Sequence, residues 1–195
     1  VSPLDATPCG PWSAVLDSLF GGTPLPAVAA VEASTRGEPS LGLVGAAELL
    51  DRLAVSIDGV GTPAPREGLG RCLTDDPWNW GDPDRAHRPC GAHQAGRMSR
   101  GDLIVEGGVG QGLLVVLGDL RMSATRFHGI LLVGGRLQLQ GGAQVVGFAR
   151  ASGGVEIDAA SSVTGSGCRA LRALEGLRLA LARPLATPSG RLGPP

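Results

Sequence analysis

Residues 101–157 carry one short pattern four times: GDLIV (101–105), GDLRM (118–122), GRLQL (135–139) and GGVEI (153–157). The opening glycines are 17, 17 and 18 residues apart, and the first apolar column after them holds Leu103, Leu120, Leu137 and Val155. Apolar and polar residues alternate within these segments, which is typical of a half-buried β-strand. One such segment cannot bury its own apolar face, so the repeat predicts coils that stack and share a core.

Two further apolar registers follow each segment. Phe127, Val145 and Val163 stand two residues before a glycine at a spacing of 18, and the runs LLVV, ILLV and FARA form the third register. Three short strands per repeat, separated by glycine turns, predict a mainly β fold, a short β-solenoid of about four coils. The alternative is a small antiparallel sandwich with hairpins at 134–135 and 141–142. A sandwich, however, does not require the same residue type every 17 to 18 positions.

Composition limits the classes of partner. The chain has 195 residues and a net charge of −1, which gives no reason to expect nucleic acid or an anionic membrane surface as a partner. No run of 18 apolar residues occurs, so we expect no membrane span in this sequence. A chain of this length forms one domain with appendages, or two small domains.

The sequences that flank the repeat predict caps, because the ends of a solenoid expose strand edges that native proteins cover. All fifteen prolines lie outside 101–183, as expected for strands that need their N–H donors. Amphipathic patterns that begin at Pro11 and Leu43 predict helices that pack on the solenoid. We expect four parts: an N-terminal helical and loop cap region (1–100), the solenoid (101–167), a C-terminal capping helix (168–183) and a flexible tail (184–195).

Residues 59–100 are poor in apolar side chains and rich in proline and glycine. A loop of this length needs a clamp in a compact domain. Cys72 and Cys90 are placed to provide one, as a disulfide that closes a loop of about 19 residues and contributes on the order of 3 kcal/mol. The other two cysteines, Cys9 and Cys168, would tie the N-terminal segment to the C-terminal helix. In a reducing compartment all four would be thiols or metal ligands.

Two metal sites are alternatives for this loop. Zinc ligands are offered by Cys72, His87, Cys90 and His93. The two cysteines lack the short spacing of a structural zinc site. Oxygen ligands for calcium are offered by Asp75, Asp76, Asp82 and Asp84. These carboxylates lack EF-hand spacing. A disulfide and a solvated turn explain the same residues better, and we expect no cofactor.

Catalytic motifs are scarce. GGVGQG (107–112) suggests a phosphate-binding loop, but such a loop requires a helix directly after it, and LLVVLGDL predicts a strand. Ser123, His128 and Asp119 lie within one repeat, but a triad is defined by geometry and not by proximity in sequence. We therefore expect no enzymatic activity. A carbohydrate-active enzyme is a less favoured alternative, because four coils with few aromatic residues offer little groove for a glycan.

A resemblance adds to this interpretation. The chain contains NWGDP (79–83) between Cys72 and Cys90, a GQG that leads into the repeat, and SGCRALRAL (166–174) after it. This combination resembles the C-terminal region of bacterial envelope proteins that are similar to accessory proteins of type IV pilus assembly. The resemblance covers about residues 72–175, and its most specific part is the cysteine-bounded NWGDP. It implies an extracytoplasmic β-solenoid module, in a compartment where the cysteines form disulfides.

Together with this resemblance, the sequence predicts a non-enzymatic structural or assembly module in the periplasm or at the cell surface, either pilus-associated or another part of the cell envelope. The alternative is an accessory subunit docked on the periplasmic or outer face of a larger membrane complex, in secretion or electron transport. Either function requires protein partners. Trp78 and Trp80, in a loop expected to be exposed, are the predicted partner-binding anchors, because aromatic side chains dominate interface energetics. Replacing both with alanine should then leave the melting temperature nearly unchanged.

Overall fold

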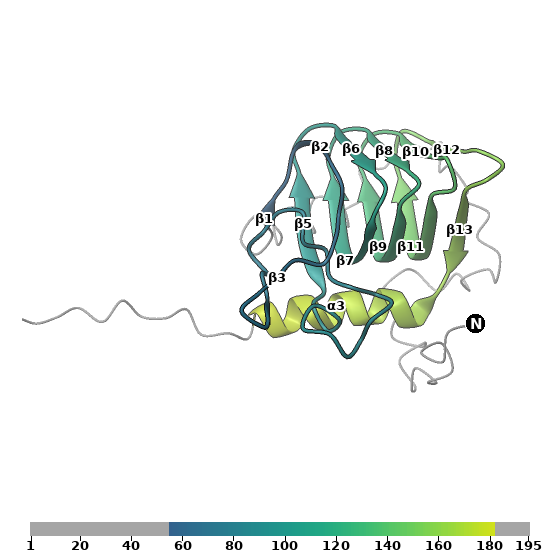
Figure 1. Cartoon of the computed structure of the whole chain (residues 1–195). Coiled ribbons are helices and arrows are strands. Elements are labelled where there is room, and N and C mark those ends of the chain that lie inside the picture. Colours follow the sequence, from purple (N-terminus) through teal and green to yellow (C-terminus); the bar gives the residue numbers. More distant parts are fainter. Residues whose placement is uncertain (1–54, 182–195) are drawn as a thin grey trace, which may run out of the picture.

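The computed structural model describes residues 55–181, with side chains as far as Gly176, and it is a β-solenoid (Figure 1). Its strands form two parallel sheets that wind around a common core. The larger sheet contains β1 (Val55–Ser56), β5 (Ala95–Ser99), β7 (Val109–Val116), β9 (Arg126–Val133), β11 (Gln144–Ala151) and β13 (Ser162–Gly165). The smaller sheet contains β2 (Gly59–Gly61), β6 (Leu103–Glu106), β8 (Leu120–Ser123), β10 (Leu137–Gln140) and β12 (Val155–Ile157). The predicted fold class is confirmed, and the antiparallel sandwich is wrong.

The predicted apolar column pairs in register from coil to coil. Leu103 pairs with Leu120, Leu120 with Leu137 and Leu137 with Val155. The three leucines are fully buried, whereas Val155, in the last described coil, is half-buried. Stacked aliphatic columns of this kind supply most of the burial that holds a solenoid together.

Each coil contains two strands rather than the three that the sequence predicts. The second and third apolar registers lie on one long strand, which bends at a column of glycines formed by Gly112, Gly129 and Gly147. Their φ angles are +124°, +141° and +143°. A Cβ at Gly129 would lie 2.0 Å from the carbonyl oxygen of Gly112 in the preceding coil. The glycines therefore bend the strand without interrupting its hydrogen-bonded ladder.

The aspartates of the repeated GDL motif connect successive coils. The Asp102 carboxylate accepts a hydrogen bond from the Asp119 backbone N–H at 2.8 Å, and the Asp119 carboxylate accepts one from the Arg136 N–H at 2.7 Å. These bonds satisfy main-chain donors at a corner where the strand ladder is interrupted. The motif thus combines an apolar core residue with a polar corner residue.

The coils begin before Gly101, which the sequence marked as their start. β2 pairs with β6, and β5 pairs with β7, in the same parallel register as the later coils. The first described turn of the solenoid is therefore built from residues 55–61, and β5 begins the next turn after a long excursion. The predicted helices near Pro11 and Leu43, and the predicted tail 184–195, lie outside the described residues.

A helix follows the coils, as predicted: α3 (Gly167–Leu181). It lies along the larger sheet, against β11, β9, β7 and β5, and so runs back along the stack (Figure 1). Ala170 and Ala173 of the helix are buried in a cluster with outward-facing side chains of the sheet: Met98, Leu113, Val115 and Ile130. The helix thus covers an apolar sheet face more than the edge of the last coil, because the long strands are apolar on both sides. Within residues 55–181 no helix is long and apolar enough to cross a membrane.

Candidate functional site: a disulfide-clamped loop

The long excursion from the first coil, residues 62–94, is here called the clamped loop. It leaves the solenoid wall at Pro63, touches it again at Trp80 and rejoins it at Ala95. The Val109 N–H donates to the Pro63 carbonyl at 3.1 Å, and the Gln111 N–H donates to the Trp80 carbonyl at 2.7 Å. Pro63 and Trp80 therefore take the place of a strand beside the first half of β7. The loop also contains a small hairpin, β3 (Glu67–Gly68) and β4 (Arg71–Cys72).

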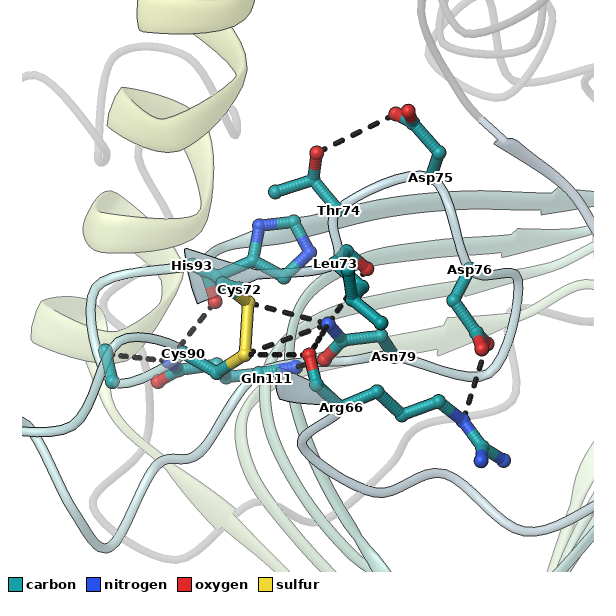
Figure 2. Close-up of a disulfide and its surroundings, with 12 residues drawn as sticks. Arg66, Cys72, Leu73, Thr74, Asp75, Asp76, Asn79, Cys90, His93 and Gln111 are labelled. Atoms are coloured by element: carbon teal, nitrogen blue, oxygen red, sulfur yellow. Dashed lines mark hydrogen bonds and ion pairs between the residues drawn. A yellow bond between two sulfur atoms is a disulfide. The ribbon is translucent and has the colours of Figure 1, made fainter. Parts of the chain in front are cut away.

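The predicted disulfide between Cys72 and Cys90 is confirmed, with a Cα–Cα distance of 4.9 Å (Figure 2). Cys90 is fully buried. Both sulfurs are used in the bond, so neither residue is a thiolate ligand for zinc in this structure. The second predicted bridge joins Cys168 to Cys9, and Cys9 lies outside the described residues.

Asn79 is the polar centre of the clamped loop. Its side chain is fully buried, and its amide group donates to the carbonyls of Arg66 at 3.0 Å and Leu73 at 2.8 Å. The same amide lies 3.2 Å from the Cys72 sulfur, as the dashed lines of Figure 2 show, and its oxygen accepts from the Gly81 N–H. The asparagine of NWGDP therefore joins the two residues that flank the β3–β4 hairpin to the disulfide.

Arg97 of β5 attaches the clamped loop to the coils. It occupies an inward position of its strand, and its side chain is 2% exposed. The guanidinium donates to main-chain carbonyls of Thr74, Asp76, Pro77 and Asn79 in the loop, and to that of Gly96. Burial lowers the pKa of Arg97 to about 10, and the nearby Asp76 and Asp75 act in the opposite direction. The charge is held in the interior because backbone oxygens replace the lost water.

Gln111 and Asp82 hold the second half of the loop. Gln111 is buried, and its amide donates to the carbonyls of Gly91 at 2.8 Å and His93 at 3.0 Å. The buried Asp82 carboxylate accepts from the N–H groups of Asp84 and Arg85, as an Asx turn does. The glutamine of the GQG segment thus binds backbone of the loop, whereas the sequence offered only a phosphate loop or solenoid turns as its explanation.

The pKa of His93 is lowered from its ordinary value. Burial is the main cause, and the cationic Arg97 adds to it. The backbone of Asn79 and the carboxylate of Asp75 act in the opposite direction. The imidazole therefore favours its neutral form beside the clamp.

The expected exposure of the two tryptophans is wrong for Trp80. Its side chain is fully buried and its ring lies edge-on to Phe127, with centroids 6.0 Å apart. Gly110 leaves the room for it, since a Cβ there would lie 2.7 Å from the Trp80 Cβ. Trp78 is half-buried and stacks on Trp80 at 5.8 Å. The double alanine variant should therefore lose stability, contrary to the expectation from sequence.

The acidic residues of the loop do not converge. Asp76 pairs with Arg66 at 3.2 Å, and Asp84 pairs with Arg126 of β9. The candidate triad residue Asp119 binds the backbone of the next coil. Among the described residues, no group of three or more His, Cys, Asp or Glu side chains is arranged to hold a metal ion. Of the zinc candidates, His87 is exposed and His93 half-buried.

A hollow of about 770 Å³ lies beside the β3–β4 hairpin. Its lining is formed by the hairpin and the segment that follows: Gly68, Leu69, Arg71, Cys72, Leu73, Thr74, Asp75 and Asp76. The sequence did not predict this hairpin, because β3 and β4 have two residues each and no alternating pattern.

The fold and the clamped loop define a class of protein: a parallel β-solenoid whose first coil carries a disulfide-clamped excursion. No family model, no curated protein and no solved structure matches this chain.

Proposed function

We propose that this protein is a non-enzymatic, extracytoplasmic structural or assembly module of the bacterial cell envelope that works by presenting a rigid surface to protein partners. One observation carries the proposal. The buried polar side chains Asn79, Asp82, Arg97, Ser99, Gln111 and Thr125 all bond to main-chain atoms of the protein itself. Asn79, Asp82, Arg97 and Gln111 hold the clamped loop in one conformation. Ser99 and Thr125 bond to turns of the coils, so the six side chains do not meet around a substrate-sized cavity.

The location outside the cytoplasm is supported by the Cys72–Cys90 disulfide. Such bonds persist in oxidising compartments and are rare in the cytosol. The pilus association, and the alternative of an accessory subunit on a membrane complex, rest on the sequence resemblance alone. Both require a protein partner, so one experiment addresses them together.

The test is fractionation of the source organism with an epitope tag at the native locus. We expect the protein in the envelope fraction, Cys72 and Cys90 protected from alkylation until a reductant is added, and a native-gel species larger than the monomer. A cytoplasmic protein with reactive thiols would overturn the proposed location. A monomeric envelope protein would overturn the proposed assembly role.

Catalysis is tested separately on the purified protein. Turnover of a glycan or an ester that is abolished by His87→Ala or His128→Ala would overturn the non-enzymatic proposal. We expect no turnover that depends on either histidine.

A further inference from the structure

The β3–β4 hairpin carries an unusual residue at its tip. Its two-residue loop is Leu69-Gly70, and both residues have positive φ angles, 51° and 73°. This is the backbone of a type I′ turn, in which Asn-Gly, Asp-Gly and Gly-Gly are strongly preferred. A leucine in the left-handed region is disfavoured by the contact of its Cβ with the backbone. The only other described residue besides glycine with a positive φ is Ala124.

The same leucine is fully exposed, at 105% of its reference area. Leu73, 46% exposed, lines the same hollow, and its side chain lies next to Gly68, where a Cβ would meet it at 3.2 Å. Gly68 and the two leucines all line the hollow, and they are here called the apolar strip. Leu69 is thus unfavourable both in its backbone conformation and in its exposure. Strained positions of this kind cluster at binding sites.

The hairpin is also rigidly supported. The Leu73 N–H donates to the Arg66 carbonyl at 2.9 Å, which closes the hairpin on the side opposite its tip. Asn79 donates to both of these residues, and the disulfide begins at Cys72 in β4. A side chain presented on such a support loses little conformational entropy when it is buried by a partner.

The charges around the strip indicate the chemistry of the partner. The hollow is lined by one cation, Arg71, and by two carboxylates, Asp75 and Asp76. Asp76 is paired with Arg66, whereas the exposed Asp75 accepts from the Thr74 hydroxyl at 3.4 Å. Asp75 therefore presents negative charge next to an apolar rim. A cationic side chain beside an apolar one is complementary to this surface.

We propose that Leu69 and Leu73 anchor a partner protein segment that places an apolar side chain on the strip and a lysine or arginine against Asp75. This inference rests on the proposed function and assigns the site of its protein contact. It also replaces the tryptophans as the expected anchor, since Trp80 lies in the core.

The experiment selects displayed random dodecapeptides on the full-length protein, with counter-selection on Leu69→Asn. We expect a consensus that pairs an apolar residue with Lys or Arg. A synthetic peptide of that consensus should bind Leu69→Asn about 10- to 100-fold more weakly than the wild type, as for the loss of an interface anchor. Asp75→Asn should weaken binding less, and its effect should shrink as the salt concentration rises. Arg121→Ala, on the exposed face of β8, is the matched control and should bind normally.

Leu69→Asn distinguishes a binding residue from a structural one. Asparagine suits the left-handed conformation, so this variant should melt about 1–4 °C higher than the wild type while it loses the peptide. A lower melting temperature together with weaker binding would mean that Leu69 supports the fold, and would overturn the proposal. So would the absence of a consensus, equal binding of the peptide by Leu69→Asn, or a Leu69-dependent dimer in sedimentation, which would make a second copy the occupant.

The proposal for the hairpin and the proposed function can fail independently of each other. If Leu69→Asn still enters the wild-type envelope assembly, the hairpin is not the contact, and the assembly role stands.

Discussion

The coils and the clamped loop order their backbones by different physical means. In the coils, each strand pairs with the same strand one turn later, and aliphatic columns such as Leu103, Leu120 and Leu137 are buried between them. In the clamped loop, few backbone groups pair with a strand. Buried Asn79, Arg97 and Gln111 bind its carbonyls instead, and one disulfide closes it. In the coils the strand ladders satisfy most backbone groups and side chains such as Asp102 and Asp119 serve only the corners, whereas the irregular loop depends on side chains for most of its pairing.

The two regions meet at Trp80 and Arg97. Trp80 belongs to the loop, but its ring lies in the core next to Phe127 of β9. Arg97 belongs to β5, but its guanidinium binds the loop. The loop therefore completes the solenoid wall beside the first half of β7, whereas β1 and β2 form the N-terminal edges of the two described sheets. Four predictions test whether the coils and the clamped loop depend on each other for stability.

The largest effect is expected from a charge in the column of the coils. Leu120→Asp or Leu137→Asp buries a carboxylate at a fully buried position, which should lower the free energy of unfolding by about 5 kcal/mol or more. That is comparable to the total stability of a domain, so both variants should be unfolded by circular dichroism. Arg121→Asp, at the exposed next position of the same strand, should fold. Cooperative, wild-type-like melting of Leu120→Asp would contradict the stacked core.

The glycine column of the larger sheet should be the next most sensitive. In Gly129→Ala the backbone would keep a φ of +141°, and the new Cβ would lie 2.0 Å from the Gly112 oxygen. We therefore expect the free energy of unfolding, measured in urea, to fall by roughly 2–4 kcal/mol. Gly101→Ala is the control, since a Cβ there has no heavy atom within 4 Å. Equal stability of the two variants would show that the strands bend without the glycines.

Removal of the disulfide should affect the loop more than the coils. In the double variant Cys72→Ser/Cys90→Ser the free energy of unfolding should fall by about 3 kcal/mol, because the disulfide no longer restricts the conformations of the unfolded chain. Hydrogen exchange should accelerate at loop amides such as Asp82 and His93, whose N–H groups both donate to Cys90. Amides of β9 and β10 should exchange more slowly than those of the loop. Uniform acceleration in both regions would show that they unfold as one unit.

The smallest effect is a pH dependence in the loop. The folded-state pKa of His93 lies below its ordinary value of 6.5, so between these two values the unfolded chain binds more protons. Stability should therefore fall as the pH decreases through about 6.5, and the loss should level off below the folded-state pKa. His93→Gln should reduce the difference in melting temperature between pH 7.5 and pH 5. His87→Gln, at an exposed position of the same loop, should keep it. An unchanged pH difference in His93→Gln would contradict this assignment.

The sequence by itself determined the features that depend on period and local pattern. The spacing of Gly101, Gly118 and Gly135 predicted parallel coils, because stacked turns must repeat the same residue type at the same place. The proline-rich loop between Cys72 and Cys90 predicted a disulfide, because an unpaired loop of that length needs a covalent or polar clamp. Both predictions required no knowledge of which distant residues touch.

Only the tertiary structure decided where irregular segments lie against the coils. Alternation in β5 places Arg97 on the core side, but its acceptors come from a loop some twenty positions away in sequence. Trp80 is buried because Gly110, on another strand, leaves space for its ring. α3 lies on the sheet because Leu113 and Ile130 face outward together only after the coils have stacked. Whether a side chain is buried depends on residues that are distant in the sequence, and the local sequence pattern does not show which residues these are.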